Sequence, residues 1–219
     1  MVFGNHLKES MQDTLMKADG VAVIFIGIAG ALSKMLVIKG GTIDTTDTMM
    51  MIISLSLGAI VGEMLDLDGK IIHFGEWLKI KTGNAKDKKF VAGFVTASLT
   101  VCIGAMAVVG SIEDGIHADH SILFAKAILD FVIILVMSAT LGKGCLFSFV
   151  PVGLFQGTIT LLASLISPFI TASAMSALSY IGSILIFCVG VNLVFNTKIR
   201  VANLLPALIV ACICTVFPL

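Results

Sequence analysis

An aspartate and a lysine stand four residues apart within one long apolar stretch of this sequence. Asp130 lies in the middle of that stretch, and Lys126 precedes it by one helical turn. Residues at i and i+4 share a helix face, so the two side chains are expected to meet. A charged residue at the centre of a bilayer costs roughly 2.5–3.5 kcal/mol on insertion scales, and such residues mark ion or proton pathways. Two interpretations stay open: a structural pair that neutralises itself, and a protonatable or cation-coupled site.

Three more polar residues are candidates for a pathway through apolar surroundings: Gln156, Asn192 and Glu63. Gln156 stands beside Gly157, where an amide and exposed backbone could bind a small polar solute. An interhelical hydrogen bond is the favoured alternative for Gln156, and Asn192 could likewise join helices. Glu63 opens an acidic cluster over residues 63–68, which could pair with a lysine or gate an inner opening.

The segment 113–120 combines three carboxylates with two histidines. His117, Asp119 and His120 are weak candidates for a metal site, because transition metals accept these ligand types. Their spacing matches no standard zinc motif, so neither a metal nor a cofactor is predicted. Asp119 is expected instead to cap the helix that follows it. The sequence contains no nucleophile elbow, P-loop, dinucleotide fingerprint or HExxH motif, so an enzyme is not predicted.

The composition places these residues in a lipid bilayer. Hydrophobic residues make up 58% of the 219 residues and charged residues 13%, with no net charge. Soluble domains carry about 25% charged residues, so an ordinary soluble enzyme, a disordered chain and a nucleic-acid binder are excluded. The prediction is one all-α, polytopic membrane domain over residues 1–219. Seven stretches have the length and hydropathy of a span: residues 20–38, 48–65, 90–112, 121–141, 145–167, 174–195 and 202–217.

Three further features are predicted outside or within these spans. Residues 1–19 have apolar side chains at helical spacing, which suits either an amphipathic interfacial leader or a solvated one. The long segment 66–89 contains an amphipathic helix over 67–81 with Trp77 as an interfacial anchor. The fifth span is predicted to be a broken helix, because Pro151, Gly153, Gln156 and Gly157 interrupt it.

The basic residues predict the orientation of the chain. With the N-terminus inside, eleven lysines and arginines lie on inner segments, Lys34 and Lys39 lie outside, and Lys126 lies within a span. This asymmetry follows the positive-inside rule. The N-terminus and loop 66–89 are therefore expected on the cytoplasmic side of the membrane, and the C-terminus outside.

Gly58 and Gly62 form a small-xxx-small pattern in the second span. Such a pattern lets two helices approach closely, and packing within the monomer is the favoured use here. The small size and the Gly-rich faces of the chain also favour a homo-oligomer, with a dimer as the first expectation.

Six sequence blocks carry a resemblance to a known family. They read LGAIVGE at 57–63, GEWL at 75–78, GFVTASL at 93–99, SIEDG at 111–115, DHS at 119–121 and KIRVANLLPA at 198–207. With these blocks the chain resembles the YqgA/YdfK-like family of uncharacterised bacterial inner-membrane proteins over nearly its whole length. The resemblance implies a multi-span membrane protein with no established substrate. Members of that family usually begin with one further apolar helix; either the start of this chain was trimmed or this member lacks that helix.

The leading hypothesis is a small transporter or channel for an ion or small polar solute, with a polar site near the membrane midplane at broken or Gly-rich helices. The working residues would be Asp130 with Lys126, Gln156 and Asn192. The alternative is a membrane-embedded sensor or scaffold without transport activity, which would use the segment 113–120 for sensing.

Overall fold

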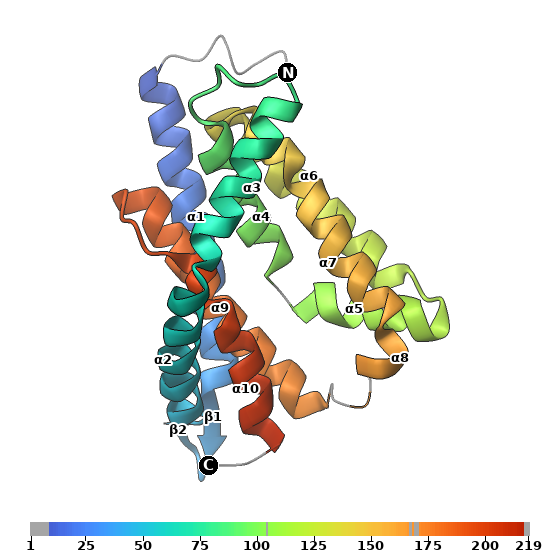
Figure 1. Cartoon of the computed structure of the whole chain (residues 1–219). Coiled ribbons are helices and arrows are strands. Elements are labelled where there is room, and N and C mark those ends of the chain that lie inside the picture. The colour runs from blue at the N-terminus through green and yellow to red at the C-terminus, as the bar shows by residue number, and fades with distance from the viewer. Residues whose placement is uncertain (1–8, 104, 167, 169–170, 217–219) are drawn as a thin grey trace.

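The computed structural model describes residues 9–103, 105–166, 168 and 171–216. Apart from one hairpin, the described chain folds into helices (Figure 1). In chain order the elements are α1 (Glu9–Met35), β1 (Leu36–Lys39), β2 (Thr42–Thr45), α2 (Thr48–Leu65), α3 (Leu67–Lys81), α4 (Phe90–Cys102), α5 (Ala105–His117), α6 (Ser121–Leu141), η1 (Lys143–Ser148), α7 (Phe149–Leu161), α8 (Ala163–Ile166), α9 (Ala172–Phe195), η3 (Val201–Leu204) and α10 (Pro206–Val216).

Within the described residues, five helices are long and apolar enough to cross a membrane. They cover Asp13–Met35, Thr48–Leu65, Ser121–Leu141, Lys143–Leu161 and Ala172–Phe195. The bent pair α4 and α5 makes a sixth span if it crosses as one unit. The seventh predicted span corresponds to the shorter apolar helix Val201–Thr215. The all-α polytopic class is therefore confirmed, whereas the count of seven is not.

The first and sixth predicted spans, α1 and α9, pack against each other over most of their length. Glycine permits this close approach: a Cβ at Gly27 would lie 2.6 Å from the backbone nitrogen of Phe187. α1 continues without a break from Glu9 through Gly20 to Met35, so the described part of the predicted leader is the first three turns of a spanning helix. The leader residues 1–8 lie outside the described residues.

α2 and α10 form the second close pair on the same side of the molecule. A Cβ at Gly58 would lie 2.4 Å from the backbone nitrogen of Ala207, and one at Gly62 would lie 1.8 Å from the carbonyl oxygen of Asn203. Gly58 and Gly62 therefore serve packing within the chain, as predicted. α3 follows after a left-handed Asp66 (φ 45°), and its buried Gly75 lies on Phe94 of α4.

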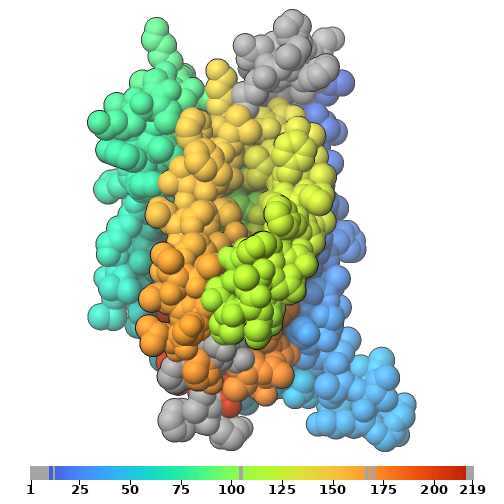
Figure 2. All heavy atoms as spheres, turned by 90° about the vertical axis from the view of Figure 1, so that its right-hand side faces the viewer, coloured from blue at the N-terminus to red at the C-terminus, as the bar shows by residue number. Residues whose placement is uncertain are grey.

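The remaining long helices lie on the other side of Figure 1, where α6 and α7 pack against both α4 and α5. Figure 2 shows this face from outside. The outer face of α6 is strongly apolar, and Phe124, Ile128 and Phe131 are each 67% exposed. Such a surface is expected where a helix contacts lipid rather than water.

The third span is broken, and the fifth is continuous at the residues that were predicted to interrupt it. α7 runs unbroken through Gly153, Gln156 and Gly157, so the predicted position of the interruption is wrong; the stretch 145–167 divides instead into η1, α7 and α8. Pro151 is tolerated because it stands in the first turn of α7, where backbone N–H groups have no helical partner. The third span instead divides into α4, which ends at Cys102, and α5, and the two axes are bent by 62°.

A β-hairpin joins α1 to α2 and projects from the helices at the lower right of Figure 2. β1 and β2 pair antiparallel, and the turn residues Gly40 and Gly41 have φ of 58° and 84°. Two consecutive residues with positive φ make a turn that suits the twist of a hairpin, and glycine adopts this conformation without strain. The hairpin is not among the elements predicted from the sequence, although a glycine pair between two short segments is a usual hairpin signal.

Candidate functional site

Lys126 and Asp130 form an ion pair along one face of α6, as their spacing predicts. Asp130 is the tenth of 21 residues in the helix. At a rise of 1.5 Å per residue it lies about 14 Å from the first residue and about 17 Å from the last. The Lys126 residue is 6% exposed, and the side chain of Asp130 is 21% exposed. The pair therefore lies near mid-span, with its ammonium group the more deeply buried partner.

Lys126 also binds the backbone of the broken third span. Its Nζ donates a hydrogen bond of 2.9 Å to the carbonyl oxygen of Val101, which belongs to the last turn of α4. Carbonyls in the last turn of a helix lack helical donors and carry partial negative charge, which a cation stabilises. Broken helices at membrane depth need such partners. The ammonium group thus lies between a carboxylate on α6 and a helix end on α4.

Gln156 and Asn192 lie in different surroundings from this pair. Gln156 is half-buried on α7, and among the described residues its side chain makes no hydrogen bond. The amide of Asn192 donates to the Ile199 carbonyl at 2.8 Å and accepts from the Ile199 N–H at 3.0 Å. Thr197 donates its hydroxyl to the same amide oxygen at 2.7 Å. Asn192 therefore holds the segment that follows α9 against the helix.

Glu63 belongs to a second polar cluster, at the end of α2. Its two carboxylate oxygens accept hydrogen bonds of 2.5 Å from Arg200 and from the amide of Asn203. Asn203 is buried, and its side-chain oxygen accepts the Asp68 N–H at 2.8 Å. Arg200 also lies 3.7 Å from Asp66. The cluster joins α2, the start of α3 and η3, three segments that come from distant parts of the sequence.

The pH dependence of stability offers a test of this cluster through Asp68. Burial raises the pKa of Asp68; Arg200 opposes this, whereas Asp66 and Glu63 add to it. A raised pKa means that folding disfavours the charged carboxylate, so this penalty appears as pH rises above 3.8 and persists at neutral pH. We expect Asp68→Asn to melt at the same or a higher temperature than the wild type at pH 7, with the difference vanishing toward pH 4.

Melting temperatures in detergent across this pH range check the expectation, with Asp44→Asn on the exposed hairpin as the matched control. The substitution keeps the backbone N–H that Asn203 binds, so that hydrogen bond is not at issue. A lower melting temperature for Asp68→Asn at pH 7 would contradict the assignment.

The segment 113–120 forms two histidine–carboxylate contacts. His117 lies 2.7 Å from Glu113, and His120 contacts Asp114. Asp119 accepts the Ser121 N–H at 2.9 Å just before α6, but the N-cap position belongs to His120, one residue after the predicted cap; hydrogen bonds from Ser121 lower the pKa of Asp119. Among the residues that the structure describes, no group of three or more His, Cys, Asp and Glu side chains is placed to hold a metal ion.

The sequence analysis missed the Val101 carbonyl and the break beside it. A backbone oxygen has no signature in the sequence, and its partner lies 25 residues along the chain. In the sequence, the glycine that follows Ile103 indicates where a helix is able to break, since a glycine within an apolar helix lowers its helical propensity. The same signal gave a wrong prediction for α7, where two glycines lie in an unbroken helix.

Long apolar helices, one of them bent, around a buried ion pair define an α-helical polytopic membrane protein. The chain belongs to the family described as Protein of unknown function (DUF554), whose family model matches residues 1–216. The predicted resemblance to the YqgA/YdfK-like family is thereby confirmed.

Two relatives cover nearly the whole chain. "Uncharacterized membrane protein YdfK" of Bacillus subtilis (strain 168) is 28% identical over 210 residues, which are 95% of this chain and 85% of the relative. "Uncharacterized protein YqgA" of Escherichia coli (strain K12) is 25% identical over 214 residues, which are 96% of this chain and 86% of the relative. No solved structure matches the chain significantly.

Proposed function

We propose that this protein is a membrane transporter or channel for a small solute or ion, with Lys126 and Asp130 at its working site. One observation carries the proposal: the buried ammonium group of Lys126 binds both the Asp130 carboxylate and the Val101 carbonyl at the end of a broken span. Ionisable residues at this depth are costly and mark pathways. Discontinuous helices with free carbonyls provide cation sites in many transporters.

The mechanism follows from the two partners of Lys126. A charged Asp130 holds the ammonium group on α6, from where it reaches the Val101 carbonyl of α4. A proton or small cation that binds Asp130 neutralises the carboxylate and weakens its attraction for Lys126. The Val101 carbonyl is then the remaining partner of the ammonium group, and the 62° break allows α4 and α5 to reorient as this contact adjusts. Occupancy of Asp130 is in this way coupled to the shape of the third span.

We further propose a bacterial inner-membrane location with the N-terminus and residues 66–89 in the cytoplasm and the C-terminus outside, which the distribution of basic residues supports. α1 begins at one end of the molecule and α10 ends at the other, as an odd number of crossings requires (Figure 1).

We also propose a homodimer, which an exposed strip of α7 supports. Gly153 and Gly157 share one face of α7 and have open space where their side chains would stand, with nothing within 4 Å. A small-xxx-small face of this kind lets a second helix approach closely in a membrane.

Flux into liposomes tests the proposed function. Purified protein is reconstituted with a pH-sensitive dye inside, and sodium, potassium, amino acids, carboxylates and sugars are added one at a time outside. We expect at least one of them to produce flux with the wild type and only protein-free background with Asp130→Asn. Asp13→Asn is the matched control, because Asp13 forms an exposed i, i+4 pair with Lys17. Equal flux in Asp130→Asn and the wild type, or no flux with any probe, would overturn the proposal.

A sensor without transport is the second candidate, and the two histidine–carboxylate contacts of the segment 113–120 favour it. The absence of flux in the same liposomes would favour this candidate.

A further inference from the structure

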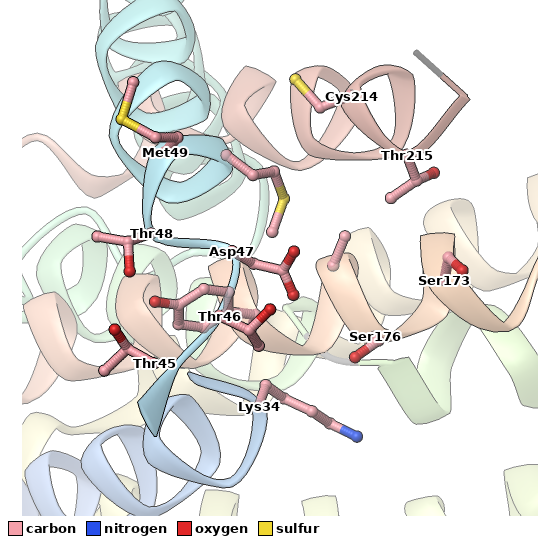
Figure 3. A pocket seen from close by; sticks show the side chains of 13 residues that line it. Lys34, Thr45, Thr46, Asp47, Thr48, Met49, Ser173, Ser176, Cys214 and Thr215 are labelled. Atoms are coloured by element: carbon pink, nitrogen blue, oxygen red, sulfur yellow. The ribbon is translucent and has the colours of Figure 1, made fainter. Parts of the chain in front are cut away.

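A cavity of about 630 Å³ lies at the end of the molecule where the hairpin joins α2. Its walls come from α1, the hairpin strand β2 and segment 46–47, and helices α2, α9 and α10 (Figure 3). This volume falls in the usual range for small-molecule sites, about 300–1,000 Å³. None of the residues singled out in the sequence analysis as a site lines this cavity.

One cation and one anion line the cavity without neutralising each other. Lys34 lies in the last turn of α1, Asp47 precedes α2, and neither belongs to an ion pair among the described residues. Figure 3 shows the carboxylate of Asp47 directed into the space between α2 and α9, and the amine of Lys34 extended below it. By contrast, Lys39 and Asp44 on the hairpin are also a lysine and an aspartate, but they lie 3.7 Å apart in an exposed ion pair. This pair does not line the cavity.

The backbone of Asp47 has an unusual conformation that fixes the direction of its side chain. Its φ of 58° and ψ of 19° are left-handed, a conformation that aspartate and asparagine adopt more readily than other non-glycine residues. Its side chain makes no capping hydrogen bond to α2, so the carboxylate remains available to a ligand. The first turn of α2, whose backbone N–H groups have no helical partners, forms part of the same wall of the cavity.

The other walls divide into hydroxyls and apolar groups. Thr46, Thr48, Ser173 and Ser176 supply hydroxyls that can donate or accept hydrogen bonds. Apolar surface comes from residues that include Met50, Ala177, Tyr180 and Cys214. Tyr180 is 1% exposed, and its hydroxyl is already engaged with the sulfur of Met51 at 3.2 Å, which leaves its ring as a wall.

We infer that this cavity binds a small zwitterion with an apolar side chain, of the class of the neutral α-amino acids. The Lys34 ammonium would hold the carboxylate of the solute, Asp47 would hold its ammonium group, and the methionine and tyrosine wall would cover its side chain. A ligand with only one charge would leave Asp47 or Lys34 desolvated and unpaired, which is unfavourable. The inference deepens the proposed function, because it names the substrate class of the transporter and its outer binding site.

Binding of L-leucine to the protein in nanodiscs tests the inference without requiring transport. The lipid is phosphatidylglycerol alone, so that no zwitterionic headgroup competes. Two probes of the same shape each lack one charge: 4-methylpentanoate has only the acid, and 3-methylbutylamine has only the amine. We expect leucine to bind the wild type about tenfold or more tightly than either probe, a factor that corresponds to one well-made polar contact.

Variants then assign each charge. In Lys34→Gln leucine should bind no more tightly than 3-methylbutylamine, and in Asp47→Asn no more tightly than 4-methylpentanoate. Asparagine tolerates the left-handed backbone, so Asp47→Asn should remain folded. Lys39→Gln and Asp44→Asn are the matched controls and should bind leucine as the wild type does.

Four outcomes would overturn the inference: no leucine binding, equal binding of a one-charge probe, equal loss in the control variants, or loss of leucine binding when phosphatidylethanolamine is added, which would assign the cavity to a lipid headgroup. Flux measurements on the wild type and on Asp130→Asn distinguish a failure of this inference from a failure of the proposed function. Leucine binding without flux would refute transport alone, whereas Asp130-dependent flux of another solute without leucine binding would refute this inference alone.

Discussion

We expect Lys126→Met to lose about 3–5 kcal/mol of stability, the range measured when one partner of a buried ion pair is removed. The variant leaves the Asp130 carboxylate without its cation in a low-dielectric position. It also removes the donor from the Val101 carbonyl, and an unsatisfied buried acceptor adds a further penalty. Reversible unfolding in mixed micelles, followed by circular dichroism, measures the effect.

Lys17→Met is the matched control. Lys17 also pairs with an aspartate four residues away, at 2.8 Å, but its side chain is 48% exposed. Exposed helix pairs of this type contribute about 0.3–0.5 kcal/mol, so this variant should remain close to the wild type. Comparable losses in Lys126→Met and Lys17→Met would contradict the buried placement of the pair.

A double variant separates stability from function. Lys126→Met with Asp130→Leu removes both charges, and apolar replacement of a buried ion pair is often neutral or stabilising. We expect the double variant to recover most of the stability that Lys126→Met loses. Its flux should nevertheless stay at background, because no group is left to bind a proton or cation. A double variant that is folded and active would show that the pair has only a structural role.

The second large effect is expected at Gly62, where Gly62→Ala should prevent most of the protein from folding. A Cβ there would lie 1.8 Å from the carbonyl oxygen of Asn203, and this oxygen belongs to backbone that cannot rotate away. α2 would have to move off η3, which would also strain the hydrogen bond between Glu63 and Asn203. We expect a loss of about 3 kcal/mol or more, the upper range for overpacking a close contact.

Gly157→Ala provides the control for Gly62→Ala. Gly157 also lies within an apolar helix, but a Cβ there has nothing within 4 Å. Alanine favours helix more than glycine does, so the monomer should keep or gain stability. The yield of monodisperse protein and its melting temperature in detergent compare the two variants. If both substitutions were tolerated equally, the close contact between α2 and η3 would be wrong.

Local patterns of the sequence were sufficient for the membrane class and for the main spans. Apolar runs that include residues 121–141 and 174–195 predicted α6 and α9 to within a few residues. The pairing of Lys126 with Asp130 was also predictable, because both residues belong to one helix and their spacing sets their relative direction. The placement of Asp119 just before α6 and the use of Gly58 and Gly62 in packing follow from equally local reasoning.

Features that involve distant segments could not be predicted in this way. Glycine and proline indicate where a helix is able to break, but the packing around them decides whether it does. α7 keeps its helix through Gly153 and Gly157, whereas the third span bends by 62° beside a lysine that stabilises the free helix end. The partners of Glu63 were likewise not predictable, since Arg200 and Asn203 lie more than 130 residues away.

The sequence by itself determined a polytopic α-helical membrane protein with an ion pair near the middle of one span, because hydropathy and helical spacing act within single segments. Only the tertiary structure decided what the pair touches and where the cavity lies. Val101 meets Lys126 because α4 packs beside α6, and Lys34 and Asp47 face one cavity because α1, α2, α9 and α10 converge around it. Both arrangements depend on contacts between helices that are distant in the sequence. Such contacts leave no local pattern along the chain.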